Sequence, residues 1–188
     1  MNRRLLIIVL MACLLPLGMQ AQQGTFRFAQ LTDIHLTPNN PNPTEDLLRS
    51  IAQINATDSI DFVLVTGDLT EEGDRATMEK VKSCLDLLKV PYHVALGNHE
   101  TKWSDSGCTA FGEIFGGERF EFEHKGFLFL GFNSGPLMRM AYGHVVPQDI
   151  RWMTEEMEKN GKDKPVILVT HYPLMDLSLI HISEPTRL

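Results

Sequence analysis

The chain has 188 residues, of which 43% are apolar and 22% are charged, and its formal net charge is −7. This length and composition are those of one globular domain with a real core, and they argue against a disordered chain or a repeat array. The negative charge disfavours nonspecific binding to a nucleic-acid backbone, so we predict no stable nucleic-acid partner.

Residues 1–21 have the three parts of a secretory signal: a basic start with Arg3 and Arg4, an apolar stretch, and small residues before a cleavage point after Ala21. We therefore expect export to the periplasm or the outside of the cell. The apolar stretch is short for a membrane span, so the mature chain is expected to have none. Two alternatives stay open. They are an uncleaved anchor and a lipoprotein signal, because residues 10–13 resemble a lipobox.

The remaining domain, residues 22–176, alternates short apolar runs with segments of helical periodicity. The apolar runs predict strands at residues 26–31, 62–65, 91–96 and 165–169. Helical spacing predicts helices at residues 44–56, 75–89 and 147–160, and a short helical turn at residues 111–115. Thr44 is the expected N-cap of the first helix. Strands that alternate with helices predict an α/β fold whose central strands are mostly parallel.

An antiparallel element interrupts this alternation. Residues 119–123 and 127–132 are strand-like, and the short link between them contains Gly126, which is typical of a hairpin. Two cysteines lie outside the signal, Cys84 and Cys108, and they could pair in an oxidising compartment. Cys84 lies on the apolar side of a predicted helix, which favours a buried free thiol. The sequence leaves the pairing and the oligomeric state open.

Polar motifs follow four of the predicted strands. They read Thr-Asp-Ile-His, Thr-Gly-Asp-Leu, Leu-Gly-Asn-His-Glu and Thr-His-Tyr-Pro, and their chemically reactive side chains are Asp33, His35, Asp68, Asn98, His99 and His171. Carboxyl ends of parallel strands share one edge of a sheet, where reactive residues collect. Divalent metals bind such a mixture of oxygen and nitrogen donors. Each motif alone is weak, but four in order after apolar runs indicate one metal site.

These motifs, in this order, are similar to the successive motifs of calcineurin-like metallophosphoesterases over residues 26–176. The resemblance implies a four-layer α/β/β/α sandwich with two divalent metal ions as cofactors, and Mn, Fe and Zn all suit the ligands. It also implies hydrolysis of small phosphoester substrates, diesters or monoesters, by a hydroxide that the two metals activate.

The resemblance also implies a role for each matched residue. The metal ligands would be Asp33 and His35 at the first metal, Asp68 between both metals, and Asn98 and His171 at the second. His99 would be catalytic, because it would contact the phosphate or protonate the leaving oxygen. The alternative is a noncatalytic metal-binding or interaction domain with the same fold, and the intact His99 counts against it.

Other side chains near the motifs carry weaker expectations. Glu100 either orients the loop of the Asn-His motif or is merely exposed. His93 lies inside a predicted strand and is expected in the core. The pair Asn133-Ser134 follows a strand and is a candidate to support the site. Trp103 and Trp152 are expected to pack inside the fold instead of stacking on a base.

The chain departs from the family pattern near its end. The pattern closes with a Gly-His-x-His element that gives each metal one more ligand, and no such element follows His171 here; His181 is not assigned to the site. Residues 177–187 resemble the translation of a sequencing adapter, so we expect residues 177–188 to be a non-native tail and the natural protein to continue beyond Asp176. The second sheet would then be incomplete, and this chain would bind metal weakly and have little activity. The alternative is a natural short chain with a polar tail.

Overall fold

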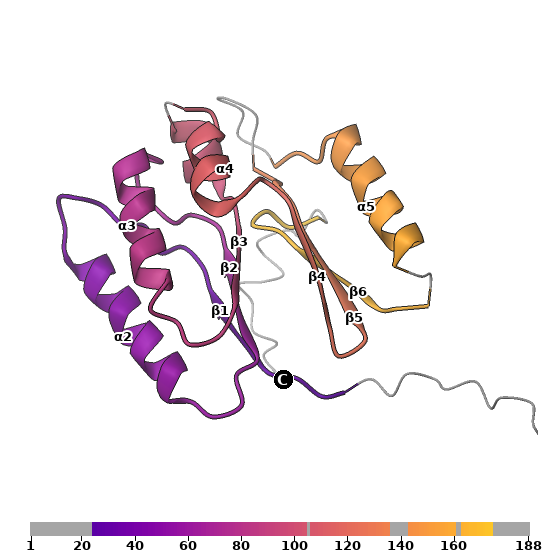
Figure 1. Cartoon of the computed structure of the whole chain (residues 1–188). Helices are drawn as coiled ribbons and strands as arrows, with labels where there is room; N and C mark the ends of the chain where they lie inside the picture. Colours follow the sequence, from indigo (N-terminus) through magenta and orange to yellow (C-terminus); the bar gives the residue numbers. More distant parts are fainter. Residues whose placement is uncertain (1–23, 105, 136–142, 161–162, 175–188) are drawn as a thin grey trace, which may run out of the picture.

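The computed structural model describes residues 24–104, 106–135, 143–160 and 163–174. Two three-stranded sheets stand beside each other (Figure 1). The first is parallel throughout, in the order β1 (Phe28–Leu31), β2 (Phe62–Thr66), β3 (Tyr92–Ala95). In the second, β5 (Phe127–Gly131) pairs antiparallel with β4 (Phe120–His124) and parallel with β6 (Val166–Val169). The predicted α/β class is confirmed. The predicted signal and tail, residues 1–21 and 177–188, lie outside the described residues.

The helices flank the two sheets (Figure 1). They are α2 (Asn42–Ala56), α3 (Arg75–Leu85) and α4 (Thr109–Phe115) on the side of the first sheet, and α5 (Pro147–Lys159) beside the second. The predicted N-cap Thr44 is wrong. Helix α2 begins at Asn42 with a proline in its first turn, where a missing N–H costs no hydrogen bond. The buried Oγ1 of Thr44 has no hydrogen-bond partner. Helix α3 ends at Leu85, not at residue 89 as predicted.

Strand β2 is buried on both faces, which explains its continuous apolar sequence. Val63 and Val65 belong to the apolar cluster that includes residues of α2 and α3. Phe62 and Leu64 belong to a second cluster with Phe129 and other side chains of the second sheet. Successive side chains of a strand point to opposite faces, so β2 holds helices on one side and the other sheet on the opposite side.

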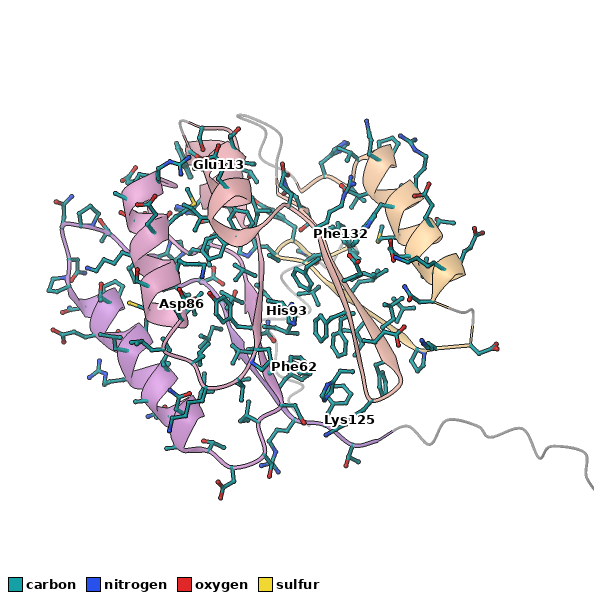
Figure 2. All side chains as sticks on the ribbon, viewed as in Figure 1. Phe62, Asp86, His93, Glu113, Lys125 and Phe132 are labelled. Atoms are coloured by element: carbon teal, nitrogen blue, oxygen red, sulfur yellow. The ribbon has the colours of Figure 1, made fainter. Side chains whose placement is uncertain are left out.

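Aromatic side chains fill the space between the sheets, where Figure 2 shows Phe62 and His93. The Phe62 and Phe129 rings meet edge to face, with centroids 5.2 Å apart. The His93 imidazole stacks on Phe122 with centroids 3.8 Å apart, and its burial lowers its pKa. His93 therefore packs between the sheets, as predicted for a core residue.

The hairpin of β4 and β5 turns through Lys125 and Gly126, both with positive φ, 46° and 86°. Two successive left-handed residues suit the twist of a tight hairpin, which is why a glycine stands here. The Lys125 Nζ donates to Asp61 Oδ1 at 2.8 Å and to the Thr25 carbonyl at 3.1 Å. The hairpin tip of the second sheet is thus fastened to the first.

Cys84 is buried and Cys108 is half-buried, and the structure has both thiols free. Within the part of the chain that the structure describes, helices are too short or too polar to cross a membrane.

Candidate metal centre

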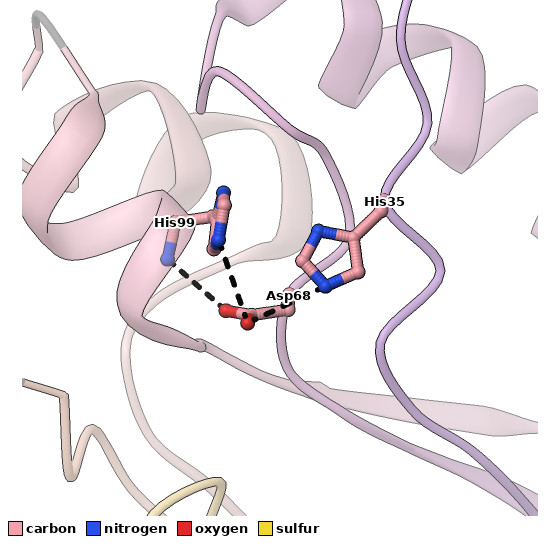
Figure 3. Close-up of side chains that lie close together, drawn as sticks. All are labelled: His35, Asp68 and His99. Atoms are coloured by element: carbon pink, nitrogen blue, oxygen red, sulfur yellow. Dashed lines mark hydrogen bonds and ion pairs between the residues drawn. The ribbon is translucent and has the colours of Figure 1, made fainter. Parts of the chain in front are cut away.

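The loops that follow β1, β2, β3 and β6 meet around the carboxylate of Asp68, which is 4% exposed. Its Oδ2 lies 3.8 Å from His35 Nε2, 3.9 Å from His99 Nε2 and 3.4 Å from His171 Nε2. Figure 3 shows two of these imidazoles, His35 and His99, on either side of Asp68. Side chains far apart in the sequence therefore converge on one carboxylate.

The two remaining predicted ligands lie beside these imidazoles. Asp33 Oδ1 is 3.8 Å from His35 Nε2, and Asn98 Oδ1 is 3.2 Å from His171 Nε2. All six predicted site residues are thus brought together.

Within this site, two groups of possible ligand atoms each lie within 4.8 Å of one another: His35, Asp68 and His99, and Asp33, Asp68 and His171. Asp68 belongs to both groups. The first group includes His99, which the family resemblance assigned to the phosphate instead of a metal. Carboxylate oxygens and imidazole nitrogens at this spacing fit a divalent cation, so the residues present are suited to hold metal.

Backbone carbonyls orient two of the imidazoles. The Nδ1 of His171 is 2.8 Å from the Thr66 carbonyl oxygen, and the Nδ1 of His99 is 2.5 Å from that of Glu71. A carbonyl accepts from Nδ1–H, which leaves Nε2 to face Asp68. Metal-binding histidines commonly have such a second hydrogen bond.

The pKa values of Asp68 and His171 reflect their proximity. Burial acts to raise the pKa of Asp68, but hydrogen bonds from His171 and from the His99 N–H outweigh it and lower the pKa. Burial acts to lower the pKa of His171, but the hydrogen bond to Asp68 outweighs it and raises the pKa. Each of the two groups therefore favours the charged form of the other.

The backbone at the site is unusual. Asp33, His35 and Asp68 have φ of 53°, 48° and 52°, in the left-handed region that residues other than glycine rarely adopt. The Asp33 N–H donates to the Gly67 carbonyl at 3.1 Å, and the His35 N–H donates to the Asp68 carbonyl at 3.0 Å. Such strained positions cluster at functional sites, where surrounding contacts hold them.

The glycine of the third motif, Gly97, is needed for a steric reason. A Cβ on Gly97 would lie 2.1 Å from Asp68 Oδ1 and 2.2 Å from the Asp68 backbone nitrogen. Real Cβ atoms essentially never approach other atoms so closely. The Gly-Asp and Gly-Asn-His loops can touch because this position has no side chain.

Glu100 holds the same two loops together and is completely buried. Its Oε1 accepts hydrogen bonds from the Leu69 and Thr70 N–H groups at 2.9 and 3.1 Å. Its Oε2 accepts from the Gly97 N–H at 3.0 Å. Burial raises the pKa of Glu100 although these N–H groups oppose the shift. Of the two interpretations left open by the sequence, orientation of the loop is therefore the correct one.

Two further residues contribute to the site. Glu71, which the sequence analysis missed, provides the carbonyl that accepts from His99, and its Oε2 lies 3.0 Å from His35 Nδ1. The signal was an acidic side chain in the loop that carries Asp68. Ser134 Oγ accepts from the Tyr172 N–H at 2.9 Å, so it supports the loop of His171 as the sequence suggested.

The third motif continues into a short π-helix, η1 (His99–Trp103). Trp103 at its end is 53% exposed, so the predicted packing role of Trp103 is wrong. Trp152 is half-buried, with the guanidinium carbon of Arg119 5.6 Å from its ring centroid, which agrees with packing.

The sequence profile of the calcineurin-like phosphoesterases matches residues 26–185. The chain belongs to this family. Its two small sheets with flanking helices fit the fold of a metallophosphoesterase, and the family's dependence on metal agrees with the two ligand groups around Asp68.

Three relatives are similar to this chain over part of their length. It is 27% identical over 133 residues to an uncharacterized protein of Bacillus subtilis, covering 62% of this chain and 10% of the relative. It is 24% identical over 157 residues to a 3′,5′-cyclic-nucleotide phosphodiesterase of Nostoc sp., covering 80% of this chain and 58% of the relative. It is 26% identical over 132 residues to a probable glycerophosphodiester phosphodiesterase of Arcobacter nitrofigilis, covering 65% of this chain and 45% of the relative. The chain thus spans less than two thirds of each relative, and family and names together support phosphoester hydrolysis in general terms.

Proposed function

We propose that the protein hydrolyses small phosphoesters, diesters or monoesters, at a centre of two metal ions. Family membership and the phosphodiesterase names of two relatives support the reaction. The observation that carries the dinuclear form is that Asp68 belongs to both groups of possible ligands. One carboxylate within reach of two sets of donors is suited to bridge two cations.

In this proposal each side chain has a separate task. Following the family resemblance, the ligands would be Asp33 and His35 for one cation, Asp68 for both, and Asn98 and His171 for the other, and each of the two pairs lies close together. The groups of nearby atoms divide these residues differently, because they place Asp33 with His171. When bound, two divalent cations such as Mn, Fe or Zn lower the pKa of water and neutralise phosphate charge. His99, with Nδ1 held by the Glu71 carbonyl, presents Nε2 to the phosphate or to the leaving oxygen, which its protonated form can protonate.

The layer arrangement belongs to the same proposal. We infer a four-layer α/β/β/α sandwich made of α2 and α3, the two sheets, and α5. The two apolar clusters on opposite faces of β2 support this order, and so does the arrangement in Figure 1. Export, as expected from residues 1–21, would suit an enzyme that scavenges phosphate or processes envelope material.

The test compares the wild-type protein with single-residue variants of the full-length protein. Turnover would be measured with bis(4-nitrophenyl) phosphate and 4-nitrophenyl phosphate, and bound metal by elemental analysis. We expect two metal ions per chain in the natural protein. Asp68→Asn should lose most of the metal and the activity, while circular dichroism shows whether the fold persists.

His99→Ala separates an enzyme from a noncatalytic metal-binding domain. We expect this variant to keep its metal and to lose about 100- to 1,000-fold in kcat, the usual contribution of a positioned acid or base. Loss of metal in His99→Ala would instead make His99 a ligand, as its place in the first ligand group permits. A natural protein that binds two metals and hydrolyses neither ester would favour the noncatalytic alternative.

A further inference from the structure

A row of three aromatic rings leads outward from Asp68. The His35 and His99 rings meet edge to face with centroids 4.6 Å apart, and the His99 and Trp103 centroids are 6.4 Å apart. The first two rings belong to the candidate metal centre, but the indole of Trp103 has no role in it. With 53% of Trp103 exposed, this large apolar side chain is open to solvent next to the site. Tryptophan combines a large flat apolar ring with a polar N–H, which suits it to contact a ligand at such a place.

The π-helix η1 explains why these two rings are neighbours. His99 and Trp103 are its first and last residues, and one wide turn of a π-helix brings them to the same side. The Nζ of Lys102 lies 5.0 Å from the centroid of the Trp103 ring, within the range of a cation–π interaction. The turn therefore presents an aromatic face together with an ammonium group.

His99 relates this surface to the reaction. In the proposed function, His99 Nε2 faces the phosphate or the leaving oxygen, so the departing group lies on the side of His99. Because the His99 and Trp103 ring centroids are 6.4 Å apart, a group that extends from this position toward solvent past His99 would pass near the indole of Trp103. A planar group can stack on the indole, whereas an aliphatic polyol has no flat face to offer.

We propose that Trp103, assisted by Lys102, forms a leaving-group subsite that selects phosphoesters with a planar aromatic or heteroaromatic group over aliphatic ones. The catalytic part of this inference rests on the proposed function. Contact between the indole and a planar ligand does not require turnover, so the subsite and the proposed hydrolysis can be tested separately.

The first experiment measures selectivity in the full-length protein. The ratio of kcat/KM for bis(4-nitrophenyl) phosphate to that for glycerophosphoethanolamine would be compared among wild type, Trp103→Ala and Trp103→Phe. We expect the ratio to fall about 5- to 20-fold in Trp103→Ala, the lower part of the range for stacking on one ring, and to recover partly in Trp103→Phe. Trp152→Phe is the matched control and should keep the wild-type ratio. An unchanged ratio in Trp103→Ala would overturn the subsite.

The second experiment needs no turnover, because it follows tryptophan fluorescence in the same protein. The signal of Trp103 is the difference between wild type and Trp103→Phe, and that of Trp152 is the difference between wild type and Trp152→Phe. We expect AMP to quench the fluorescence of Trp103 but not that of Trp152, whereas ribose 5-phosphate, which lacks the base, quenches neither. Quenching without ester hydrolysis would leave the subsite standing and reject the proposed reaction. Hydrolysis with equal quenching by both phosphates, or with none, would reject the subsite alone.

Discussion

Two aspartates mark the opposite ends of β2, and their surroundings differ. Before the strand, Asp61 accepts from Lys125 Nζ at 2.8 Å and from the Arg27 N–H at 2.9 Å, and His124 Nε2 lies 3.4 Å away. The hydrogen bond from Lys125 is the main cause that holds the pKa of Asp61 at about 2. After the strand, Asp68 faces three imidazoles.

The two ends of β2 differ in the groups that balance the charge of the aspartate. The carboxylate of Asp61 meets a lysine, so the pair neutralises itself and ties the two sheets together. In the described part of the chain, the ion pairs of Asp33 and Asp68 are all with histidines, and none is with lysine or arginine. Lysine keeps a fixed positive charge, whereas a histidine beside a carboxylate gives up its proton when it binds a metal ion. The end with Asp68 is therefore suited to added cations, and the end with Asp61 already has the lysine as its cation.

The largest effect should come from disrupting the close contact between the loop of Gly97 and the loop of Asp68. Gly97→Ala places a Cβ against Asp68, so we expect loss of most bound metal and a decrease of about 1–3 kcal/mol in the free energy of unfolding. Gly112→Ala in α4 is the control, because its Cβ meets nothing within 4 Å. It should stabilise the protein by about 0.5–1 kcal/mol. Elemental analysis and urea unfolding report both effects, and similar results for the two variants would contradict the tight contact.

Removing one acceptor from the buried carboxylate should have the next largest effect. Glu100→Gln keeps one acceptor oxygen but turns an amide N–H₂ toward backbone N–H donors, so we expect a loss of about 1–3 kcal/mol in stability and weaker metal binding. Glu113→Gln is the control, because Glu113 forms an exposed ion pair with Arg75, and it should change stability by less than about 1 kcal/mol. Equal destabilisation of the two variants in denaturant would argue against the linking role of Glu100.

The smallest effect should come from removing the charge of Asp61, whose ion pair with Lys125 ties the two sheets together, and this effect should depend on pH. The pKa of Asp61 is about 2 in the folded protein against an ordinary value of 3.8, so the unfolded chain takes up the proton first as the pH falls. The stabilisation is therefore complete above the ordinary value and is lost as the pH falls toward about 2. Urea unfolding of wild type and Asp61→Asn should differ at neutral pH and converge in this window, without a change in metal content. A difference that stays constant over the window would exclude this ionisation as its source.

Much of this molecule could be predicted from local sequence. The strands were found because a buried strand is a short apolar run, and β2 is buried on both faces. The start of α2 was misplaced because Thr44 has the chemistry of a cap, while the proline before it already suits the first turn. The turn at Gly126 was predicted correctly, since a tight hairpin needs residues that tolerate positive φ.

The order of the motifs and the kinds of side chain at the strand ends identified the family and predicted the set of candidate site residues. Tertiary structure decided how these side chains meet: Asp68 in two ligand groups, Glu100 buried between two loops, and Trp103 turned toward solvent. The physical reason is the distance along the chain between the residues that interact. Periodicity records which face of an element is buried, whereas the direction of a loop side chain depends on hydrogen bonds to residues about 30 positions away, as at Glu100.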